Sequence, residues 1–504
     1  MGSQDLLRPR GASNQHSHPS NARGLVGHLL IALSLANLCF VSAWKRRLSS
    51  PTLFLPFWSW QDLAALLLNV TVLGLAFFLL LRLAAREKPF SRILYAVAFS
   101  LPLIAVSNLI RVLFFESALS KHSFWVVVAI GAVPILFAAA LFRWKKKLIP
   151  IVEFVTLGLT FLIPINVIQA AVEIENRGPL PQLAARLPGM PRSRIVWLIF
   201  DEVDYTLTFP RRPVGINVSE LDRLRSQSLF ATSAHQPGRD TADAIPSLLT
   251  GRMVKRVRPQ GTKTLFVQFS DDPEFVDFTK LPNTFSDAHS AQINVGVVGW
   301  YFPYCRMFPS DVTDCEWASM YSGVGDIPNV WASFRSQFFS LTPLESRMRQ
   351  IRRAPSLLAK AQQMGSDPSL GLVMVHFPLP HGPEIFDRNT GKITPFALHK
   401  DWYFDNLILA DRMLGELRGA MERAGVWDSS AVIFSSDHSL REEMMPHPNP
   451  TPLVPFMVKC PGQHVGSTYE VPMNAIITRD LIRAFELGEV SAETLPTWLR
   501  THSR

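Results

Sequence analysis

Residues 194–202 read RIVWLIFDE, a continuous apolar and β-branched run that ends in two acids. A run of this length and composition is typical of a strand that is buried on both faces. Similar runs follow at 294–298, 371–376, 431–434 and 453–458. Apolar residues spaced three or four apart predict helices over 216–228, 343–364 and 401–424. The alternation predicts an α/β fold, with a mostly parallel sheet flanked by helices.

Metal-ligating side chains follow three of these strands. Asp201 and Glu202 end the first strand, and Asp437 and His438 follow the run 431–434. The run 371–376 ends at His376, and His381 follows in the sequence Pro-His-Gly-Pro at 380–383. Because the carboxyl ends of parallel strands meet at one edge, we expect a divalent metal site there. Taken singly, the acids could cap turns and His376 could be a core histidine.

A candidate nucleophile lies in the segment RDTADAIPSLLTGR at 239–252. The hydroxyl of Thr241 is a weak nucleophile at neutral pH, and coordination to a metal would favour its alkoxide. A helix that begins near Thr241 would also help to hold an anionic phosphoryl group. The alternative reading is that Thr241 only caps this helix.

The first third of the chain has a different pattern. Five apolar stretches each approach the ~20 residues that a helix needs to cross a bilayer, and they are 24–43, 62–84, 93–115, 123–142 and 148–171. The alternative, a set of core helices in a soluble protein, is disfavoured by their number. We therefore expect a disordered tail at 1–22, a five-helix transmembrane domain at 23–172, a proline-rich linker at 173–193 and a catalytic domain at 194–504.

Charge indicates the orientation of these spans. The loops 82–92 and 143–147 are rich in Lys and Arg and should be cytoplasmic, which places everything after ~172 outside. Lys45, Arg46 and Arg47 break this rule on the first outer loop, and contact with lipid headgroups is the one explanation that the sequence offers. Residues 1–192 hold 19 Lys and Arg against 7 Asp and Glu, a net charge of 19 − 7 = +12, whereas the net charge of the whole chain is +9. The positive excess therefore lies among the spans, which argues against nucleic-acid binding.

With these motifs in place, residues 194–485 resemble the alkaline phosphatase superfamily, in its sulfatase and lipid-headgroup-transferase branch. The matching pieces occur in the family's order, and they are the strand ending in Asp201-Glu202, PSLLTGR at 246–252, His381-Gly382-Pro383, the helix DNLILADRMLGELRGAMERAG, Val426-Trp427-Asp428 and Ser436-Asp437-His438. The five-span anchor resembles that of bacterial phosphoethanolamine transferases and lipoteichoic acid synthases.

The resemblance selects Thr241 by two routes. The Leu-Thr-Gly-Arg of sulfatases, laid on 249–252, puts their nucleophilic cysteine at Thr241. The Thr-Ala-x-Ser-Val-Pro of the transferases, laid on 241–246, selects the same residue. The chain departs from sulfatases because Thr replaces this cysteine, which closes the formylglycine route and points to phosphoryl chemistry. It departs from the transferases because Ser439 replaces a glycine and their cysteine pairs near the nucleophile are missing.

The resemblance also implies roles for the site residues. Glu202, Thr241, Asp437 and His438 would bind the metal, with Asp201 as an additional acid. Zinc is expected, with manganese, magnesium or calcium as alternatives. His381 and, by a looser match, His447 would hold the substrate phosphate or protonate the leaving group. His376 would be structural. Cys305 and Cys315 are ten residues apart on the outer side, and the sequence leaves open whether they form a disulfide.

The expected function is a membrane-anchored phosphotransferase in a bacterial plasma membrane, with its catalytic domain in the periplasm. Thr241 would capture a headgroup phosphoryl unit from a membrane lipid and pass it to an envelope glycan or lipid. A membrane-tethered phosphodiesterase, phosphatase or sulfatase-like hydrolase is the first alternative. A non-catalytic anchored scaffold is the second.

Overall fold

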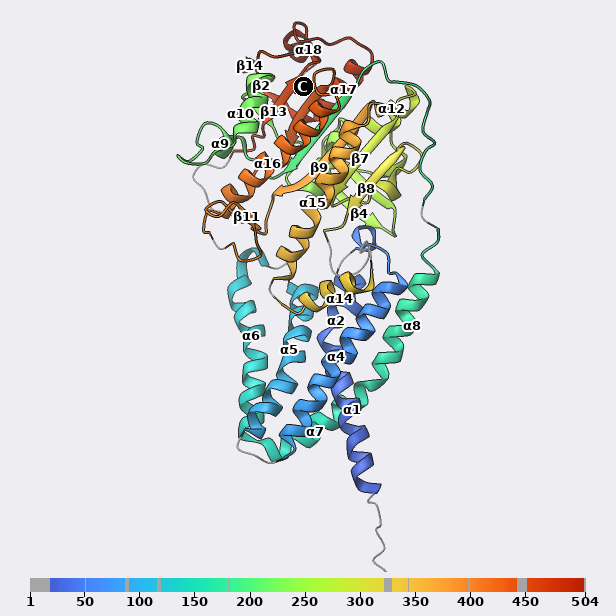
Figure 1. The fold of residues 1–504 in the computed structure, drawn as a ribbon, viewed down its shortest axis with the longest axis vertical. Coiled ribbons are helices and arrows are strands. Elements are labelled where there is room, and N and C mark those ends of the chain that lie inside the picture. The colour runs from blue at the N-terminus through green and yellow to red at the C-terminus, as the bar shows by residue number, and fades with distance from the viewer. Residues whose placement is uncertain are drawn as a thin grey trace, which may run out of the picture. The chain divides into compact units, whose positions relative to one another are not determined.

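The computed structural model describes residues 19–49, 51–86, 90–115, 119–179, 181–320, 329–342, 344–397, 399–441 and 451–502 (Figure 1). The chain forms two compact units. One comprises Met1–Lys45 and Leu63–Val172, and the other comprises Arg46–Asp62 and Glu173–Arg504. Residues 46–62, which the sequence analysis places between two spans of the transmembrane domain, thus belong to the second unit. Of the tail predicted to be disordered, residues 19–22 are helical, and 1–18 lie outside the described residues.

The first unit is helical. Its helices, two of which extend into the second unit, are α1 (Pro19–Cys39), α2 (Val41–Trp44), α4 (Trp60–Ala84), α5 (Ser91–Phe115), α6 (Leu119–Arg143), α7 (Lys145–Gly158), η2 (Leu159–Phe161) and α8 (Leu162–Glu175). Within the described part of the chain, three helical stretches are long and apolar enough to cross a membrane, namely Trp60–Ala84, Ser91–Ile110 and Lys145–Glu175. Gly24–Cys39 and Gly131–Arg143 are apolar but shorter. The predicted set of five spans is therefore not confirmed.

The basic residues after α2 have protein partners. The Arg46 guanidinium lies 2.5 Å from Glu173 Oε1 and stacks over the Trp58 ring, 5.1 Å from its centroid. The Arg47 Nε lies 3.1 Å from the other oxygen of Glu173. Arg46 is buried. The positive charges of Arg46 and Arg47 thus offset the Glu173 carboxylate inside the second unit. Contact with lipid headgroups is not needed to explain these basic residues.

The second unit is built on an eight-stranded sheet. In spatial order its strands are β14 (Ser467–Tyr469), β2 (Leu229–Ala231), β13 (Phe456–Lys459), β12 (Ala431–Ser436), β1 (Ile195–Asp201), β9 (Leu372–Pro380), β7 (Val295–Trp300) and β8 (Asp314–Ala318). β13 runs against its neighbours and every other pairing is parallel. The predicted mostly parallel sheet is confirmed, and all five predicted strands belong to it.

Helices cover both faces of this sheet. Alternate residues of β1 face opposite sides, so Trp197 packs in one apolar core and Leu198 in the other. The core around Trp197 includes residues of α11 (Thr241–Thr250), α12 (Thr284–Ser290) and α17 (Thr478–Glu486). The core around Leu198 includes residues of α10 (Ser219–Ser226), α15 (Glu345–Ser366) and α16 (Trp402–Arg423). The three predicted helices correspond to α10, α15 and α16.

Shorter elements complete the second unit. A separate antiparallel sheet, which the sequence analysis did not predict, contains β4 (Val254–Gln260), β5 (Thr264–Phe269) and β6 (Phe275–Asp277). The other strands are β3 (Ala234–His235), β10 (Phe386–Asp387), β11 (Lys392–Ile393) and β15 (Met473–Asn474). The other helices are α3 (Arg46–Ser49), η1 (Thr52–Phe54), α9 (Tyr205–Thr208), η3 (Phe278–Lys280), α13 (Tyr304–Met307), α14 (Val330–Phe339), η4 (Ala475–Ile477) and α18 (Leu495–His502).

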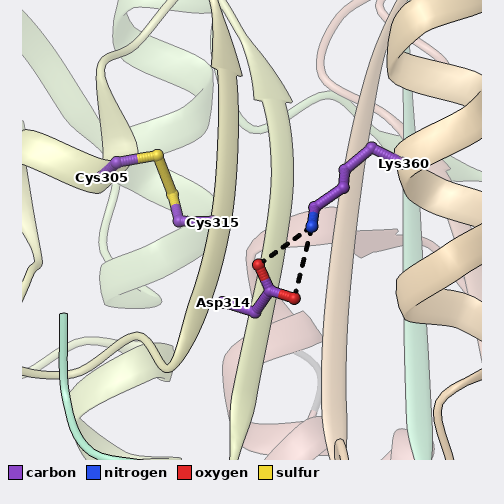
Figure 2. Close-up of a disulfide and its surroundings, with 4 residues drawn as sticks. All are labelled: Cys305, Asp314, Cys315 and Lys360. Carbon is purple, nitrogen blue, oxygen red and sulfur yellow. Dashed lines mark hydrogen bonds and ion pairs between the residues drawn. A yellow bond between two sulfur atoms is a disulfide. The ribbon is translucent and has the colours of Figure 1, made fainter.

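Cys305 and Cys315 form a disulfide between α13 and the edge strand β8 (Figure 2). The sequence left this bond open, and the structure shows it with the two α-carbons 5.6 Å apart. Lys360 of α15 pairs with Asp314 beside it, with Nζ 3.2 and 3.4 Å from the two carboxylate oxygens. The disulfide and this ion pair both hold an edge strand that has a neighbour on one side only.

We expect reduction of this disulfide to lower the free energy of unfolding by about 3 kcal/mol, because it closes a loop of ten residues. The measurement is denaturant unfolding of the full chain with and without reductant. A variant with both Cys305→Ser and Cys315→Ser is the control, and reductant should leave its stability unchanged. An equal effect of reductant on both proteins would contradict this expectation.

Candidate active site

The turn after β1 begins the site. Asp201 is the last residue of β1, and Glu202 follows with φ of +67°, a left-handed conformation that costs a non-glycine residue about 1 kcal/mol. Two contacts hold this turn. The Glu202 amide donates to Asp437 Oδ1 at 3.2 Å, and the Tyr403 hydroxyl of α16 donates to the Glu202 carbonyl at 3.1 Å. The strained turn keeps both carboxylates on the edge of the sheet.

The end of β12 is fastened to the same turn through Ser436. Its hydroxyl donates to the Phe200 carbonyl at 2.7 Å and accepts from the Val203 amide at 2.8 Å. Asp437 and His438 come directly after this serine, and both are fully buried. The two parallel strands therefore deliver their acids and the imidazole to one place, as expected for a sheet of this type.

Thr241 enters the site at the start of α11. It is the first helical residue, and the amide of the preceding Asp240 donates to Asp243 Oδ1 at 2.9 Å. Gly238 lies against this first turn so closely that an added β-carbon would be 2.5 Å from the Ala244 nitrogen, so only glycine fits there. The N-terminus of this ten-residue helix carries partial positive charge, which favours an anion beside Thr241.

The Thr241 hydroxyl lies among two acids and an imidazole. Its Oγ1 donates to Asp437 Oδ2 at 2.8 Å, and it is 3.5 Å from Asp201 Oδ2 and 3.4 Å from His438 Nε2. His438 Nε2 is in turn 3.6 Å from Asp201 and 3.5 Å from Asp437. The other nitrogen, His438 Nδ1, lies 3.0 Å from the Ser439 carbonyl. If Nδ1 carries the proton and donates there, the Nε2 lone pair faces the acids.

This cluster contains three buried carboxylates. Asp201, Glu202 and Asp437 are fully buried, and Asp201 Oδ1 and Glu202 Oε2 have no hydrogen-bond partner within the described part of the chain. Burial, and then the charges of Asp437 and Glu202, raise the pKa of Asp201 well above its usual value. Burial opposes ionisation of Asp437 too, but the His438 and His376 imidazoles hold its pKa below the usual value.

A divalent cation suits this donor set. Buried carboxylates whose oxygens lack partners are costly unless a cation compensates them. One ligand atom each from Asp201, His376 and Asp437 lie within 4.8 Å of one another. The carboxylates together with His438 Nε2, which lies 3.6 Å from Asp201 and 3.5 Å from Asp437, form a hard-to-borderline ligand set. The residues present therefore fit a divalent metal.

His376 lies behind Asp437 and already has hydrogen-bond partners on both ring nitrogens. The Trp300 indole donates to its Nε2 at 3.2 Å, and its Nδ1 is 3.1 Å from the Tyr304 hydroxyl. Burial lowers the pKa of His376 to about 4, so the ring is neutral. Its Nε2 remains 4.0 Å from Asp437 Oδ2. These contacts favour a role in positioning Asp437 over a role as a metal ligand.

His381 is held at the edge of the site by backbone contacts. Its amide donates to the Asp201 carbonyl at 3.1 Å, and its Nδ1 lies 2.6 Å from the Gly382 carbonyl. The Asn406 amide of α16 donates to the carbonyls of Pro380 and Pro383 at 3.2 and 3.1 Å, which fixes the loop. Burial lowers the pKa of His381. The other predicted histidine, His447, lies outside the described residues.

The sequence analysis missed Arg441. Its Nε donates to Glu202 Oε1 at 2.7 Å, its Nη1 to Asp240 Oδ1 at 2.9 Å, and its Nη2 lies 3.1 Å from His381 Nε2. The side chain is one-third exposed, so it lies between the buried acids and solvent. The sequence contained only a weak signal, because Arg441 is a single basic residue three positions after His438. The sequence does not reveal the course of the loop that carries it. Arg441 links Glu202 and His381, which the sequence analysis assigned to the site, with Asp240, which precedes the candidate nucleophile Thr241.

Comparisons with known proteins give only distant similarities. No family profile and no curated protein match the sequence. Among solved structures, the chain is similar to a phosphonate monoester hydrolase of Agrobacterium radiobacter at 14% identity, over 58% of this chain and 74% of that one, with a TM-score of 0.39. A protein in the alkaline phosphatase superfamily from Vibrio parahaemolyticus matches at 14% identity, over 60% and 68%, with a TM-score of 0.38. A 2-O GAG sulfatase matches at 11% identity, over 60% and 71%, with a TM-score of 0.37. Similarities this low assign no activity to the chain.

Proposed function

We propose that the chain is a membrane-anchored, metal-dependent phosphotransferase of the alkaline phosphatase superfamily, with Thr241 as its nucleophile. The observation that carries this proposal is the position of the Thr241 hydroxyl. It lies 2.8 Å from Asp437 and 3.4 Å from His438, at the N-terminus of α11, beside buried acids of which Asp201 Oδ1 and Glu202 Oε2 have no hydrogen-bond partner within the described residues. The candidate nucleophile thus lies at a helix N-terminus and beside the candidate ligands Asp201, Asp437 and His438.

Asp201, Glu202, Asp437 and His438 would hold the metal, together with the hydroxyl of Thr241. When bound, a divalent metal acts as a Lewis acid that favours the threonine alkoxide and offsets charge on the phosphoryl oxygens. Zinc suits a site of carboxylates and one imidazole, and manganese, magnesium and calcium are the alternatives. The alternative of a non-catalytic anchored scaffold predicts no such metal. Metal analysis of the purified protein therefore separates the enzyme from the scaffold.

The reaction would proceed in two displacements. In the first, Thr241 Oγ1 forms a bond to phosphorus, its proton leaves toward Asp437 Oδ2, and the bond from phosphorus to the lipid alcohol breaks. The departing oxygen takes up a proton from water and leaves as diacylglycerol. In the second, the oxygen of an acceptor hydroxyl forms a bond to phosphorus, the bond from phosphorus to Thr241 Oγ1 breaks, and Thr241 regains its proton from Asp437. With His381 Nδ1 directed at the Gly382 carbonyl, its Nε2 carries the lone pair, and it would take the acceptor's proton once the substrate displaces Arg441 Nη2, which lies 3.1 Å from it.

Arg441 and the first amides of α11 would orient the anionic phosphoryl group. We expect Arg441→Met to lower kcat/KM on the order of a hundredfold, as loss of a preorganised charged donor does at other sites. Arg441→Lys should recover only part of this, because lysine keeps the charge but lacks the planar fork that reaches Glu202, Asp240 and His381 together.

Arg412→Met is the matched control for Arg441, because the Arg412 guanidinium lies on α16 and donates to the Gly391 carbonyl outside the site. Steady-state kinetics of the three variants check this prediction. Equal losses in Arg441→Met and Arg412→Met would show that the effect is a general one of removing charge.

The membrane anchor supports a lipid as phosphoryl donor. Three helical stretches of the described chain have the length and composition to cross a bilayer, and an anchored site can reach headgroups. The charged loops of the sequence favour a catalytic domain outside the plasma membrane of a bacterium, where envelope glycans and lipids are available as acceptors. We therefore include in the proposal a membrane lipid as the phosphoryl donor and an envelope glycan or lipid as the acceptor.

The experiment that tests the function uses the purified full chain in vesicles that contain phosphatidylethanolamine or phosphatidylglycerol with a labelled headgroup. Release of diacylglycerol, with the labelled phosphoryl group on a hydroxyl acceptor, supports the transferase. Free labelled headgroup phosphate would instead make the protein a hydrolase that uses water as the acceptor at the same threonine. No metal-dependent change in either lipid would contradict both enzyme proposals.

A further inference from the structure

In the helix α14 of the second unit, whose place in the fold is shown in Figure 1, three polar side chains are buried and two aromatic side chains are exposed. Its sequence is VWASFRSQFF, and Ser333, Ser336 and Gln337 are buried. Trp331 is 67% exposed and Phe338 is 43% exposed. A surface helix of a soluble domain normally shows the opposite pattern, with its apolar face toward the core.

Hydrogen bonds fix this inverted orientation. The Ser333 hydroxyl donates to Asp62 Oδ1 at 2.6 Å, and the Gln337 amide donates to the Asp62 carbonyl at 2.9 Å. On the other side, the Arg352 guanidinium of α15 donates to the Ser336 hydroxyl at 2.9 Å. The buried face is thus a specific polar contact, so the exposed aromatic face is not the result of a loosely held helix.

Asp62, which bonds to the polar face of α14, indicates where this helix lies. Asp62 lies in the first turn of α4, a 25-residue apolar helix, and that turn belongs to the same unit as α14. If α4 crosses a bilayer, its first turn lies where lipid meets water, and α14 is attached to that turn. Tryptophan and other aromatic residues are enriched at this boundary in membrane proteins. Trp60, the first residue of α4, is also exposed.

The aromatic face is continuous and has positive charge beside it. The ring centroids of Trp331 and Phe334 are 6.2 Å apart, and those of Phe334 and Phe338 are 6.4 Å apart. Arg335 is exposed on the same helix, and it acts electrostatically on Arg352 of α15. An exposed apolar face with an exposed arginine on the same helix suits a lipid surface, which offers both acyl chains and phosphate groups.

We propose that α14 is an interfacial helix whose aromatic face, formed by Trp331, Phe334 and Phe338, inserts into the headgroup region of the bilayer leaflet next to the catalytic domain. This inference rests on the proposed membrane anchoring and not on the proposed chemistry. Its consequence is a second, non-spanning attachment that holds the catalytic domain directly against the lipid surface.

Spin labels can measure the depth of this face in the full chain reconstituted into phosphatidylcholine vesicles with a minority of phosphatidylglycerol. Single cysteines replace Trp331 and Phe338 in a background in which Cys39 and Cys460 are serine. Matched controls are labels at Val214 and Val465, two exposed apolar residues of the same unit far from α14 in sequence. Each label is tested for collisions with oxygen, which dissolves in lipid, and with a nickel chelate, which stays in water.

We expect labels at 331 and 338 to collide more with oxygen and less with nickel than labels at 214 and 465. Nickel collisions equal to those of the controls would show that the face lies in water and would overturn the proposal. Protection from both reagents would show that protein covers it, for example a second copy of the chain, and would overturn it too.

A label at Leu79, an exposed residue of α4, tests the membrane anchor separately from the interfacial helix α14. Strong oxygen collisions at 79 with none at 331 and 338 would contradict the interfacial helix but leave the anchor intact. Weak oxygen collisions at 79 would contradict the anchoring itself, and the inference with it.

Discussion

Thr241→Ala is expected to abolish turnover, with a loss in kcat of at least about three orders of magnitude, because no other hydroxyl replaces a covalent nucleophile. The substitution removes the group that donates to Asp437 at 2.8 Å and leaves the charged residues around it in place. Folding should survive, since alanine is a good residue for the first turn of a helix. Kinetics with a lipid donor and thermal unfolding of the same preparation measure the two expectations.

Thr250→Ala is the matched control for this variant. Thr250 ends the same helix, is also buried, and donates its hydroxyl to the Pro246 carbonyl at 2.7 Å. It should keep nearly full activity, whereas Thr241→Ser should keep part of it because a hydroxyl remains. Metal-dependent turnover by Thr241→Ala close to that of the unchanged protein would remove Thr241 from the mechanism.

Removal of the metal is expected to destabilise the protein strongly, and Asp201→Asn is expected to reverse part of that loss. A cation present at about a thousand times its Kd stabilises the folded state by about 4 kcal/mol. Without it, the buried carboxylates of Asp201, Glu202 and Asp437 repel one another. Asp201→Asn removes one of these charges, so the metal-free variant should unfold at a higher temperature than the metal-free unchanged protein, and zinc should stabilise it less.

In the metal-free protein, we expect the contribution of Asp201 to the free energy of unfolding to fall as pH rises. Burial, and then Asp437 and Glu202, raise the folded-state pKa of Asp201 above that of the unfolded chain, which is about 3.9. The folded state therefore binds the proton more tightly, and the stability from this group falls as pH rises above about 4 toward the folded pKa. Asp201→Asn should reduce that fall. Melting temperatures over this range check the prediction, and a steeper fall in the variant would contradict it.

The sheet could be predicted because its evidence is local. Each of the five predicted strands is an apolar run that pattern alone identifies, and the parallel pairing of β1, β7, β9 and β12 follows from the helices between them, whereas β13 is antiparallel. The edge strand β8, with sequence DCEWA, and the three-residue strands β2 and β14 lack such a run. Their place in the sheet is decided by tertiary contacts, including the disulfide from Cys305 to Cys315.

The site was predictable where residues follow strands and unpredictable where they come from loops. Asp201, Asp437 and His438 could be placed at one sheet edge from strand order, and the structure places Thr241 beside them. Arg441 could not be found in this way, because a loop carries it to Glu202, Asp240 and His381. The contacts of Arg46 and Arg47 with Glu173 were hidden for the same reason, since 126 to 127 residues separate these partners.

The central claim is that the oxygen of Thr241 becomes covalently bonded to phosphorus during turnover. The most direct measurement is acid quenching of the metal-loaded full chain during reaction with a lipid labelled in its headgroup, followed by mass spectrometry of its peptides. We predict headgroup phosphate on the peptide that contains Thr241, and none on the Thr241→Ala protein. Label on a different residue, or turnover with no labelled peptide at any quench time, would contradict the claim.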